Sequence, residues 1–144
     1  MSHKIEQLMT REVETVTPDA TVQEAAGFML RADTGSIPVC HGGTVVGMIT
    51  DRDIAVRGVA LGRGPDCTVE ELMSRDVVCA RAGDDTEAVA RKMSEAQVRR
   101  LPVLDDADRL VGMISLGDLS REAEPETATT ALEGVSSDGG AHEG

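Results

Sequence analysis

The chain of 144 residues contains no tryptophan, no tyrosine and a single phenylalanine, Phe28. Its core must therefore be built from valine, isoleucine, leucine, methionine and alanine, within an apolar fraction of 40%. No apolar run is long enough to cross a membrane, and the polar first residues do not form a signal peptide. The cysteines, Cys40, Cys67 and Cys79, lack any CxxC spacing, which is typical of reduced thiols. We expect a cytoplasmic globular protein.

Basic residues are also scarce, with 14 Lys and Arg against 26 Asp and Glu and a net charge of −12. A surface this acidic repels phosphate backbones, so nucleic acid is not an expected partner. Six of the acidic residues lie in residues 122–144, which contain no Lys or Arg. This segment is rich in Glu, Thr, Ser and Gly, and we predict an acidic disordered tail that aids solubility or touches a partner.

The sequence contains no motif that would bring catalytic or metal-binding side chains together. The histidines His3, His41 and His142 are scattered without ligand spacing, so no metal site is expected. Cys40 and His41 are adjacent on a predicted strand, where neighbouring side chains point to opposite faces. They are therefore badly placed to act as nucleophile and base, and we do not expect an enzyme.

The strongest positive feature is an internal repeat. A shift of about 64 residues aligns the two halves of the chain, and one inserted residue near 105–108 changes the shift to about 65 beyond it. The repeated residues include Glu6, Leu8, Met9, Arg11, Val13, Pro38 and Val39, matched by Glu70, Leu72, Met73, Arg75, Val77, Pro102 and Val103. Val46 to Ile49 likewise match Val111 to Ile114, and Asp53 matches Asp118. An insertion in a hairpin loop is readily tolerated, which supports the alignment.

Each copy predicts a short lead-in helix followed by a βαββα module, and the fold class is therefore α/β (α+β). In the first copy we place the lead-in helix at residues 5–9, the first strand at 13–16 and a helix that begins at residue 21. The hairpin strands follow at 36–40 and 44–49, and the last helix at 50–58. In the second copy the lead-in helix is at 69–73, the first strand at 77–80 and the next helix begins at residue 84. The hairpin strands are at 100–104 and 110–114, and the last helix is at 115–123. The predicted domains are residues 1–60 with the lead-in helix, 61–121 with a glycine-rich linker, and the tail 122–144. Each copy alone is too short to bury a comfortable core, so the copies should pack together.

Two pairs of motifs carry a family resemblance. The segments GSIPV and VRRLPV, and the segments VVGMITDRDI and LVGMISLGDL, resemble the paired signatures of cystathionine-β-synthase (CBS) domains. The resemblance spans roughly residues 5–121, and the chain is similar to small stand-alone CBS proteins of the actinobacterial hypoxic-response type.

The resemblance implies two repeats packed as a pseudo-two-fold pair, and a disc-like homodimer. It also implies clefts between the repeats that take AMP, ADP, ATP or S-adenosylmethionine, with no cofactor required. In this interpretation the chain is a ligand sensor, connected with a stress response, and passes its signal to a separate effector protein. The alternative is a dimeric interaction or scaffold protein that binds no nucleotide.

The motif Thr/Ser-x-x-Asp supplies the chemistry, as Thr50 with Asp53 and as Ser115 with Asp118. A strand-to-helix junction offers free backbone N–H groups to an anion, and a carboxylate accepts hydrogen bonds from ribose hydroxyls. The resemblance implies the ribose role for both aspartates. The same motif is also a capping box that stabilises a helix start without any ligand, so both interpretations stay open.

Residues around each junction complete the predicted sites. Arg52 could reach a phosphate, whereas Ser115 is followed by uncharged residues, and Arg99 and Arg100 either compensate there or form a solvated strand end. We expect the site of Asp53 to bind better. The resemblance adds the strand residues before each junction: Ser36, Ile37 and Pro38 in the first copy, and Arg100, Leu101 and Pro102 in the second.

Overall fold

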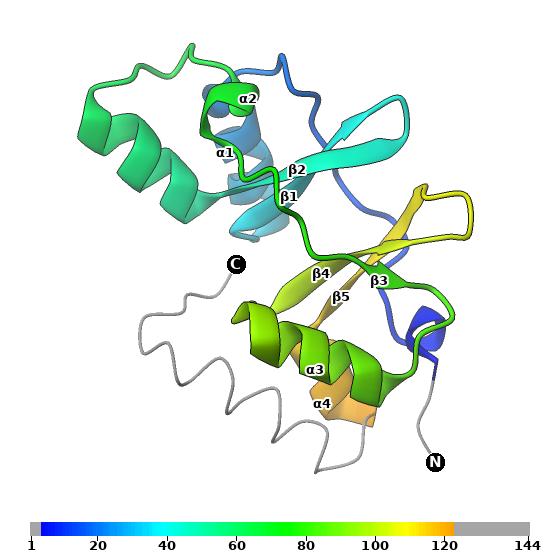
Figure 1. Ribbon diagram of the computed structural model, residues 1–144. Helices are drawn as coiled ribbons and strands as arrows, with labels where there is room; N and C mark the ends of the chain where they lie inside the picture. The colour runs from blue at the N-terminus through cyan, green and yellow to red at the C-terminus, as the bar shows by residue number, and fades with distance from the viewer. Residues whose placement is uncertain (1–3, 123–144) are drawn as a thin grey trace. The chain divides into compact units, whose positions relative to one another are not determined.

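The computed structural model describes residues 4–122. The predicted tail therefore lies outside the described residues apart from Glu122, its first residue. Figure 1 labels the main elements along the chain. Their bounds are η1 Ile5–Gln7, α1 Val22–Ala32, β1 Ser36–His41, β2 Thr44–Thr50, η2 Asp53–Gly58, η3 Val59–Leu61, α2 Val69–Leu72, β3 Ala80–Arg81, α3 Thr86–Ala96, β4 Arg100–Leu104, β5 Leu110–Ser115 and α4 Leu116–Glu122.

The chain divides into two compact units whose boundaries differ from those of the sequence repeat. Within the described range, the first unit is residues 14–77, and the second joins residues 4–13 to residues 78–122. We call residues 4–13 and 69–77 the lead-in segments of the first and second repeat. Each unit thus combines the body of one repeat with the lead-in segment of the other. The predicted boundary between residues 60 and 61 follows the repeat in the sequence, whereas packing exchanges the two lead-in segments.

The first unit is built on the antiparallel hairpin of β1 and β2. Its turn is Gly42-Gly43, and both glycines have the positive φ angles, 61° and 85°, that tight hairpin turns require. Val16 pairs in parallel with Val39 on the outer edge of β1. On the outer edge of β2, Ser74 pairs with Met48, so the second lead-in segment extends this sheet.

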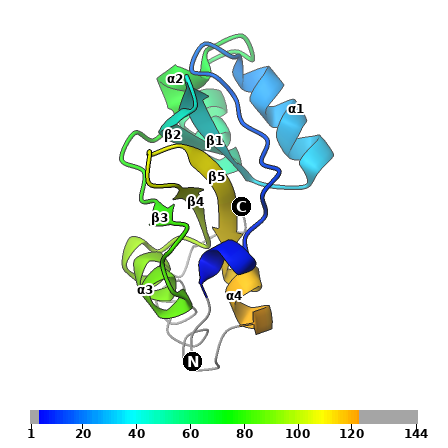
Figure 2. The same ribbon diagram turned by 90° about the vertical axis from the view of Figure 1, so that its right-hand side faces the viewer.

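The second unit repeats this arrangement with the strand order β3-β4-β5. Thr10 of the first lead-in segment pairs with Met113 on β5, and Figure 2 shows the turn η1 next to this strand. The loop between β4 and β5 contains the inserted residue, as the sequence predicts. Asp105 holds that loop because its Oδ1 accepts hydrogen bonds from the backbone N–H groups of Ala107 and Arg109.

Both long helices begin at a side-chain cap and end at a left-handed residue. Thr21 caps α1 by accepting the N–H of Glu24 at 3.1 Å, as expected for a helix from residue 21. The cap of α3 is Asp85 and not Asp84, because the Asp85 carboxylate accepts the N–H of Ala88 at 2.9 Å. The helices end at Asp33 and Gln97, which match in the repeat and have φ angles of 52° and 56°.

The helix after β2 is longer than predicted, because Gly58 does not end it. Gly58 is buried, and a Cβ atom there would lie 3.0 Å from Cδ1 of Leu72. The glycine is therefore explained by close packing against α2. The segment winds as a π-helix through Gly58, continues as a tighter 3-10 helix from Val59 to Leu61 and ends at Gly62, whose φ of 78° is left-handed. Part of the predicted linker is thus helical.

Each unit has its own buried apolar cluster, and each cluster includes lead-in residues from the other repeat. In the second unit Ile5 and Met9 join residues of the second repeat. In the first unit Val69, Leu72 and Met73 join residues of the first repeat. The other members of the first cluster are Val16, Val22, Ala25, Met29, Ile37, Val39 and Ile49.

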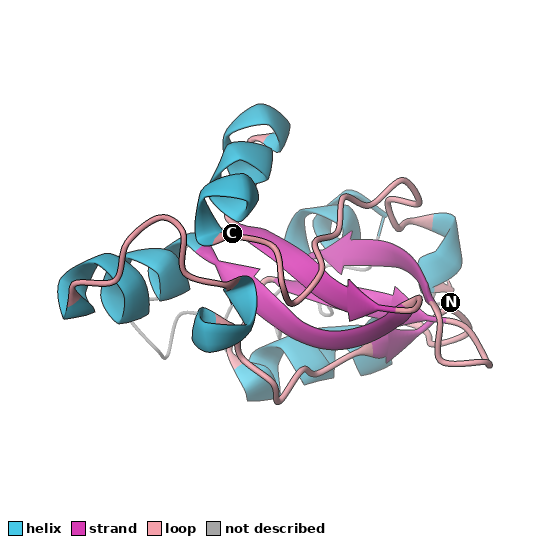
Figure 3. Cartoon of the chain, turned by 90° about the horizontal axis from the view of Figure 1, so that it is seen from above, coloured by secondary structure: helices cyan, strands magenta, loops and turns pink. Residues whose placement is uncertain are grey.

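The predicted α+β class is confirmed, since each unit combines helices with a small β-sheet (Figure 3). The first strand of each copy is shorter than expected: it is the single bridge of Val16 in the first copy and β3 in the second. Cys40, Cys67 and Cys79 are half-buried and form no disulfide. Among the described residues, no helix is long and apolar enough to cross a membrane.

Candidate functional site

The junction between β2 and η2 brings Thr50 and Asp53 into a reciprocal pair. The backbone N–H of Asp53 donates to Oγ1 of Thr50 at 3.0 Å. The backbone N–H of Thr50 donates to Oδ2 of Asp53, also at 3.0 Å. These bonds satisfy N–H groups that the helix start cannot pair internally, so the predicted capping box is present.

The junction between β5 and α4 repeats this geometry with Ser115 and Asp118. The N–H of Asp118 donates to Oγ of Ser115 at 3.1 Å, and the N–H of Ser115 donates to Oδ2 of Asp118 at 2.9 Å. The two motifs that the repeat aligns therefore share one local structure. At the first junction, capping uses only Oδ2 of Asp53 and leaves the ligand interpretation open.

The two aspartates differ in how accessible they are. Asp118 is buried, with 7% of its surface exposed, whereas Asp53 is only half-buried. Within the described residues, Oδ1 of Asp53 accepts no hydrogen bond, since the carboxylate binds the chain through Oδ2 alone. Asp53 therefore retains an oxygen that can accept hydrogen bonds from a ligand.

Ser36 lies directly across the hairpin from Thr50. Its Oγ is buried and has no hydrogen-bond partner among the described residues. A buried hydroxyl without a partner is costly, and a bound polar group would relieve that cost. Ser36, Thr50 and Asp53 are thus brought together at one end of the hairpin in the first unit.

The corresponding place in the second unit is occupied by Arg100, which pairs across the hairpin with Ser115. Arg100 and Arg99 are both half-buried at the start of β4. The carbonyl of Arg99 accepts the N–H of Leu116 at 2.8 Å, which ties the start of β4 to the start of α4. The second junction is therefore flanked by two guanidinium groups where the first has Gly35 and Ser36.

The remaining predicted site residues divide into buried and exposed ones. Ile37 and Leu101 are each 1% exposed and belong to the apolar clusters, and Pro38 and Pro102 are also buried. Any ligand contact by Ile37 or Leu101 would have to use the backbone. Arg52 is exposed in the first turn after β2, where its N–H binds Oδ1 of Asp51.

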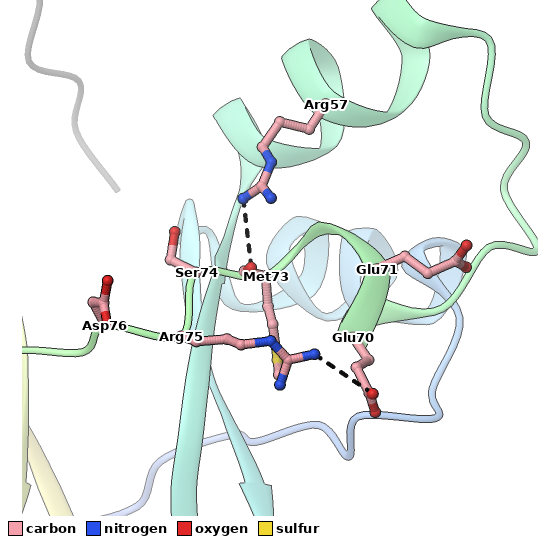
Figure 4. A pocket seen from close by; sticks show the side chains of 7 residues that line it. All are labelled: Arg57, Glu70, Glu71, Met73, Ser74, Arg75 and Asp76. Atoms are coloured by element: carbon pink, nitrogen blue, oxygen red, sulfur yellow. Dashed lines mark hydrogen bonds and ion pairs between the residues drawn. The ribbon is translucent and has the colours of Figure 1, made fainter.

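A pocket of about 630 Å³ lies in the first unit at a place that the sequence analysis missed. It is lined by Arg57, Glu70, Glu71, Met73, Ser74, Arg75 and Asp76, and Figure 4 shows these side chains. Residues 69–77 belong to the second copy of the repeat, so their position in the sequence does not place them near Arg57. Exchange of the lead-in segments creates this neighbourhood.

Hydrogen bonds and ion pairs already engage several pocket residues. Nη1 of Arg57 donates to the carbonyl of Met73 at 3.4 Å (Figure 4). Arg75 pairs with Glu70 at 3.5 Å. The backbone N–H of Thr68 donates to Glu71 at 2.8 Å, and this bond lowers the pKa of the Glu71 carboxyl.

The side chains that could ligate a metal do not cluster in the described part of the chain, and one of its thiols has a shifted pKa. No group of three or more His, Cys, Asp or Glu side chains there could hold a metal ion. Burial raises the pKa of the Cys79 thiol, which disfavours its reactive thiolate form.

Comparisons with known proteins agree with the repeat. The family model described as "CBS domain" matches residues 5–58 and 69–124. The CBS domain-containing protein YhcV of Bacillus subtilis is 41% identical over 133 residues, covering 92% of this chain and 94% of YhcV. Hypoxic response protein 1 of Mycobacterium tuberculosis is 35% identical over 123 residues, covering 84% of this chain and 85% of that protein.

A solved structure adds information on ligands in this group of proteins. It is the CBS domain pair of protein MJ0100 in complex with 5′-methylthioadenosine and S-adenosyl-L-methionine. It matches with a TM-score of 0.75 and 30% sequence identity, over 84% of this chain and 95% of that chain.

Proposed function

Since this chain belongs to the CBS-domain family and contains two CBS domains, we propose that it is a regulatory module that binds an adenosine-containing ligand. The ligand would be AMP, ADP, ATP or S-adenosylmethionine, and the protein would sense it rather than transform it. The ribose would bind at the Thr/Ser-x-x-Asp junctions, with Asp53 as the main acceptor and Asp118 as the secondary one. Three cysteines without a disulfide are consistent with action in the reducing cytoplasm.

The observation that carries this proposal is the unused hydrogen-bonding capacity beside Thr50. Oδ1 of Asp53 accepts no hydrogen bond within the described residues, and Oγ of Ser36 is buried there without a partner. Two neighbouring ribose hydroxyls can donate to a carboxylate. A capping role for Thr50 and Asp53 explains the bonds through Oδ2 but gives no use to these two oxygens.

The related CBS pair of MJ0100 supports the choice of ligand class, because it was solved with two adenosine compounds. The predicted strand residues fit a supporting role. Ile37, Pro38, Leu101 and Pro102 are buried and fix the strands that lead to the junctions. Arg52 lies beside the first junction, and Arg99 and Arg100 lie beside the second, and a guanidinium group can bind a phosphate.

Regulation would follow from a difference in ligand affinity between two states of the chain. A ligand can shift such an equilibrium only by as much as its affinities for the two states differ. The exchanged lead-in segments give a two-state response a structural basis, since the core of each unit contains residues of both repeats. The response would be read by a separate effector protein.

Isothermal titration of the full chain with AMP, ADP, ATP and S-adenosylmethionine tests the proposal. We expect saturable binding of at least one compound, weakened by Asp53→Ala more than by Asp118→Ala. Circular dichroism of each variant would establish that it is folded. Equal affinity of wild type and both variants would refute the ribose role, and no binding of any compound would refute the sensor.

A second candidate function is favoured by an exposed apolar face. Val56, Val59 and Leu61 lie on the helical segment after β2 and are 47%, 70% and 70% exposed. A second copy of the chain could cover them, as in a homodimeric scaffold that binds no nucleotide. Light scattering of wild type and of Val59→Glu/Leu61→Glu would test this: a dimer that becomes monomeric supports it, and a monomeric wild type refutes it.

A further inference from the structure

The pocket around Arg57 begins about one helical turn from Asp53. Arg57 follows Asp53 by four residues in η2, and residues at this spacing are neighbours on a helix surface. The opposite wall, residues 73–76, is fixed to β2 because Ser74 and Met48 exchange backbone hydrogen bonds of 2.9 and 3.0 Å. The junction of Asp53 and this pocket therefore belong to the same helical segment of the first unit.

Three polar groups in the pocket remain available to a ligand. Arg57 uses only Nη1, in a long contact with the Met73 carbonyl, so its other guanidinium N–H groups are unoccupied within the described residues. The Ser74 hydroxyl and the Asp76 carboxylate are exposed, and neither has a side-chain partner in that part of the chain. In Figure 4 the side chains of Ser74 and Asp76 point to the same side of the backbone.

The charge of the pocket argues against a polyphosphate. Its lining has two guanidinium groups, Arg57 and Arg75, against three carboxylates, Glu70, Glu71 and Asp76. Arg75 is already paired with Glu70, and the chain as a whole carries a charge of −12. Several negative charges on a ligand would be repelled here.

We infer that this pocket receives a zwitterionic amino-acid group, so that the chain prefers an adenosine compound bearing that group over a nucleotide polyphosphate. The guanidinium of Arg57 would take the carboxylate of such a group, since guanidinium and carboxylate match in bidentate geometry. Asp76 would accept hydrogen bonds from the ammonium, and Ser74 would add a hydroxyl. The pocket is open and polar, and its volume of about 630 Å³ is large enough for such a group.

This inference rests on the proposed function, because it assigns the second end of the ligand that Asp53 holds by its ribose. It also predicts that the two junctions of the chain differ in ligand selectivity. The repeat aligns Arg57 with Glu122 in the sequence, so the second copy has an acid where the first has the guanidinium. Only the junction of Asp53 is therefore assigned this selectivity.

The test compares ligands that share the nucleoside and differ in the attached group. S-adenosylmethionine and S-adenosylhomocysteine carry the amino-acid group, 5′-methylthioadenosine lacks it, and ATP carries phosphates instead. Titrations would use the full chain as wild type, Arg57→Ala, Asp76→Asn and Asp53→Ala. Arg91→Ala is the matched control, since Arg91 is exposed on α3 and its loss changes the net charge equally.

We expect Arg57→Ala to weaken both amino-acid-bearing compounds by about tenfold, the effect of one charge-assisted hydrogen bond. Binding of 5′-methylthioadenosine should change by less than about twofold, as should all binding to Arg91→Ala. Asp76→Asn should show a smaller loss with the same selectivity. Asp53→Ala should weaken all adenosine compounds, including 5′-methylthioadenosine.

Two results would overturn the inference while the proposed function stands. One is that Arg57→Ala binds S-adenosylmethionine as wild type does, and the other is that wild type binds ATP more tightly than S-adenosylmethionine. If no adenosine compound binds the folded wild type, both the inference and the proposed function are wrong.

Discussion

A Cβ atom on Gly47 would lie only 2.6 Å from Sδ of Met73. The repeat contains the same relationship in the second unit, where a Cβ atom on Gly112 would lie 2.6 Å from Sδ of Met9. Real Cβ atoms do not approach sulfur so closely. Glycine at this strand position therefore allows each lead-in segment to pack on the sheet of the other repeat.

Gly47→Ala should destabilise the chain by about 1–3 kcal/mol, the usual cost of overpacking a well-packed core. The new methyl group would also meet the backbone oxygen of Ser74 at 2.8 Å, and backbone cannot move aside as easily as a side chain. Urea denaturation would measure the loss. Gly83→Ala is the control, because a Cβ atom there has nothing within 4 Å. Equal stability of the two variants would contradict the close packing.

Exchange of the lead-in segments predicts different behaviour for two fragments of equal length. Residues 14–77 contain a complete unit, whereas residues 1–64 lack Val69, Leu72 and Met73, which are buried in the cluster of that unit. The fragment 14–77 should show helical circular dichroism and a thermal transition. The fragment 1–64 should be poorly folded or should self-associate, as light scattering would detect. A stable monomeric 1–64 fragment would show that the exchange is not needed.

Stability should depend on pH through Glu71. Hydrogen bonds from Thr68 lower the pKa of this carboxyl in the folded chain, so the ionised form stabilises folding. The contribution is complete above the ordinary glutamate pKa of about 4.3 and is lost as pH falls through the lowered folded-state pKa. Glu71→Ala should therefore be less stable than wild type at neutral pH. Thermal unfolding at several pH values should show the difference shrinking in acid; a difference that grows in acid would oppose this assignment.

Asp118→Ala should cost more stability than Asp53→Ala. Both aspartates cap a helix, and loss of such a cap costs about 0.5–2 kcal/mol. Removal of either carboxylate leaves a backbone N–H without its partner, that of Ser115 or that of Thr50. Asp118 is buried, at 7% exposure, so water reaches the vacated N–H less easily there and its loss costs more. Thermal melts without ligand would compare the variants. With ligand, the order should reverse for affinity, because Asp53 holds the accessible oxygen.

Much of the fold could be predicted from the sequence because its local signals are strong. The strands of both hairpins were placed within one residue of their observed ends, since period-two apolar patterns and the Gly42-Gly43 turn mark them clearly. The capping pairs at Thr50 and Ser115 followed from their spacing alone. The end of η2 at Gly58 was predicted, but its continuation as η3 to Leu61 was not, because Gly58 was interpreted only as a helix end and not as a residue packed closely against Leu72.

The exchange of lead-in segments could not be predicted in the same way. Ile5 and Val69 have the same pattern in their own copies, and nothing in that pattern says which sheet each segment joins. Only three-dimensional packing decides this. The pocket at Arg57 was missed for the same reason, since its two walls come from different copies of the repeat. The one hint in the sequence is that the repeat aligns Arg57 with Glu122, so that the two copies differ in charge at this position.

The central claim is that the carboxylate of Asp53 receives ribose hydroxyls, and titration with adenosine and 2′,3′-dideoxyadenosine tests it most directly. Wild type should bind adenosine more tightly by at least about tenfold, because the analogue cannot make these charge-assisted bonds. Asp53→Ala should bind both compounds equally weakly, since the acceptor is gone. If the variant distinguishes the two compounds as well as wild type does, Asp53 is a helix cap and not a ligand-binding residue.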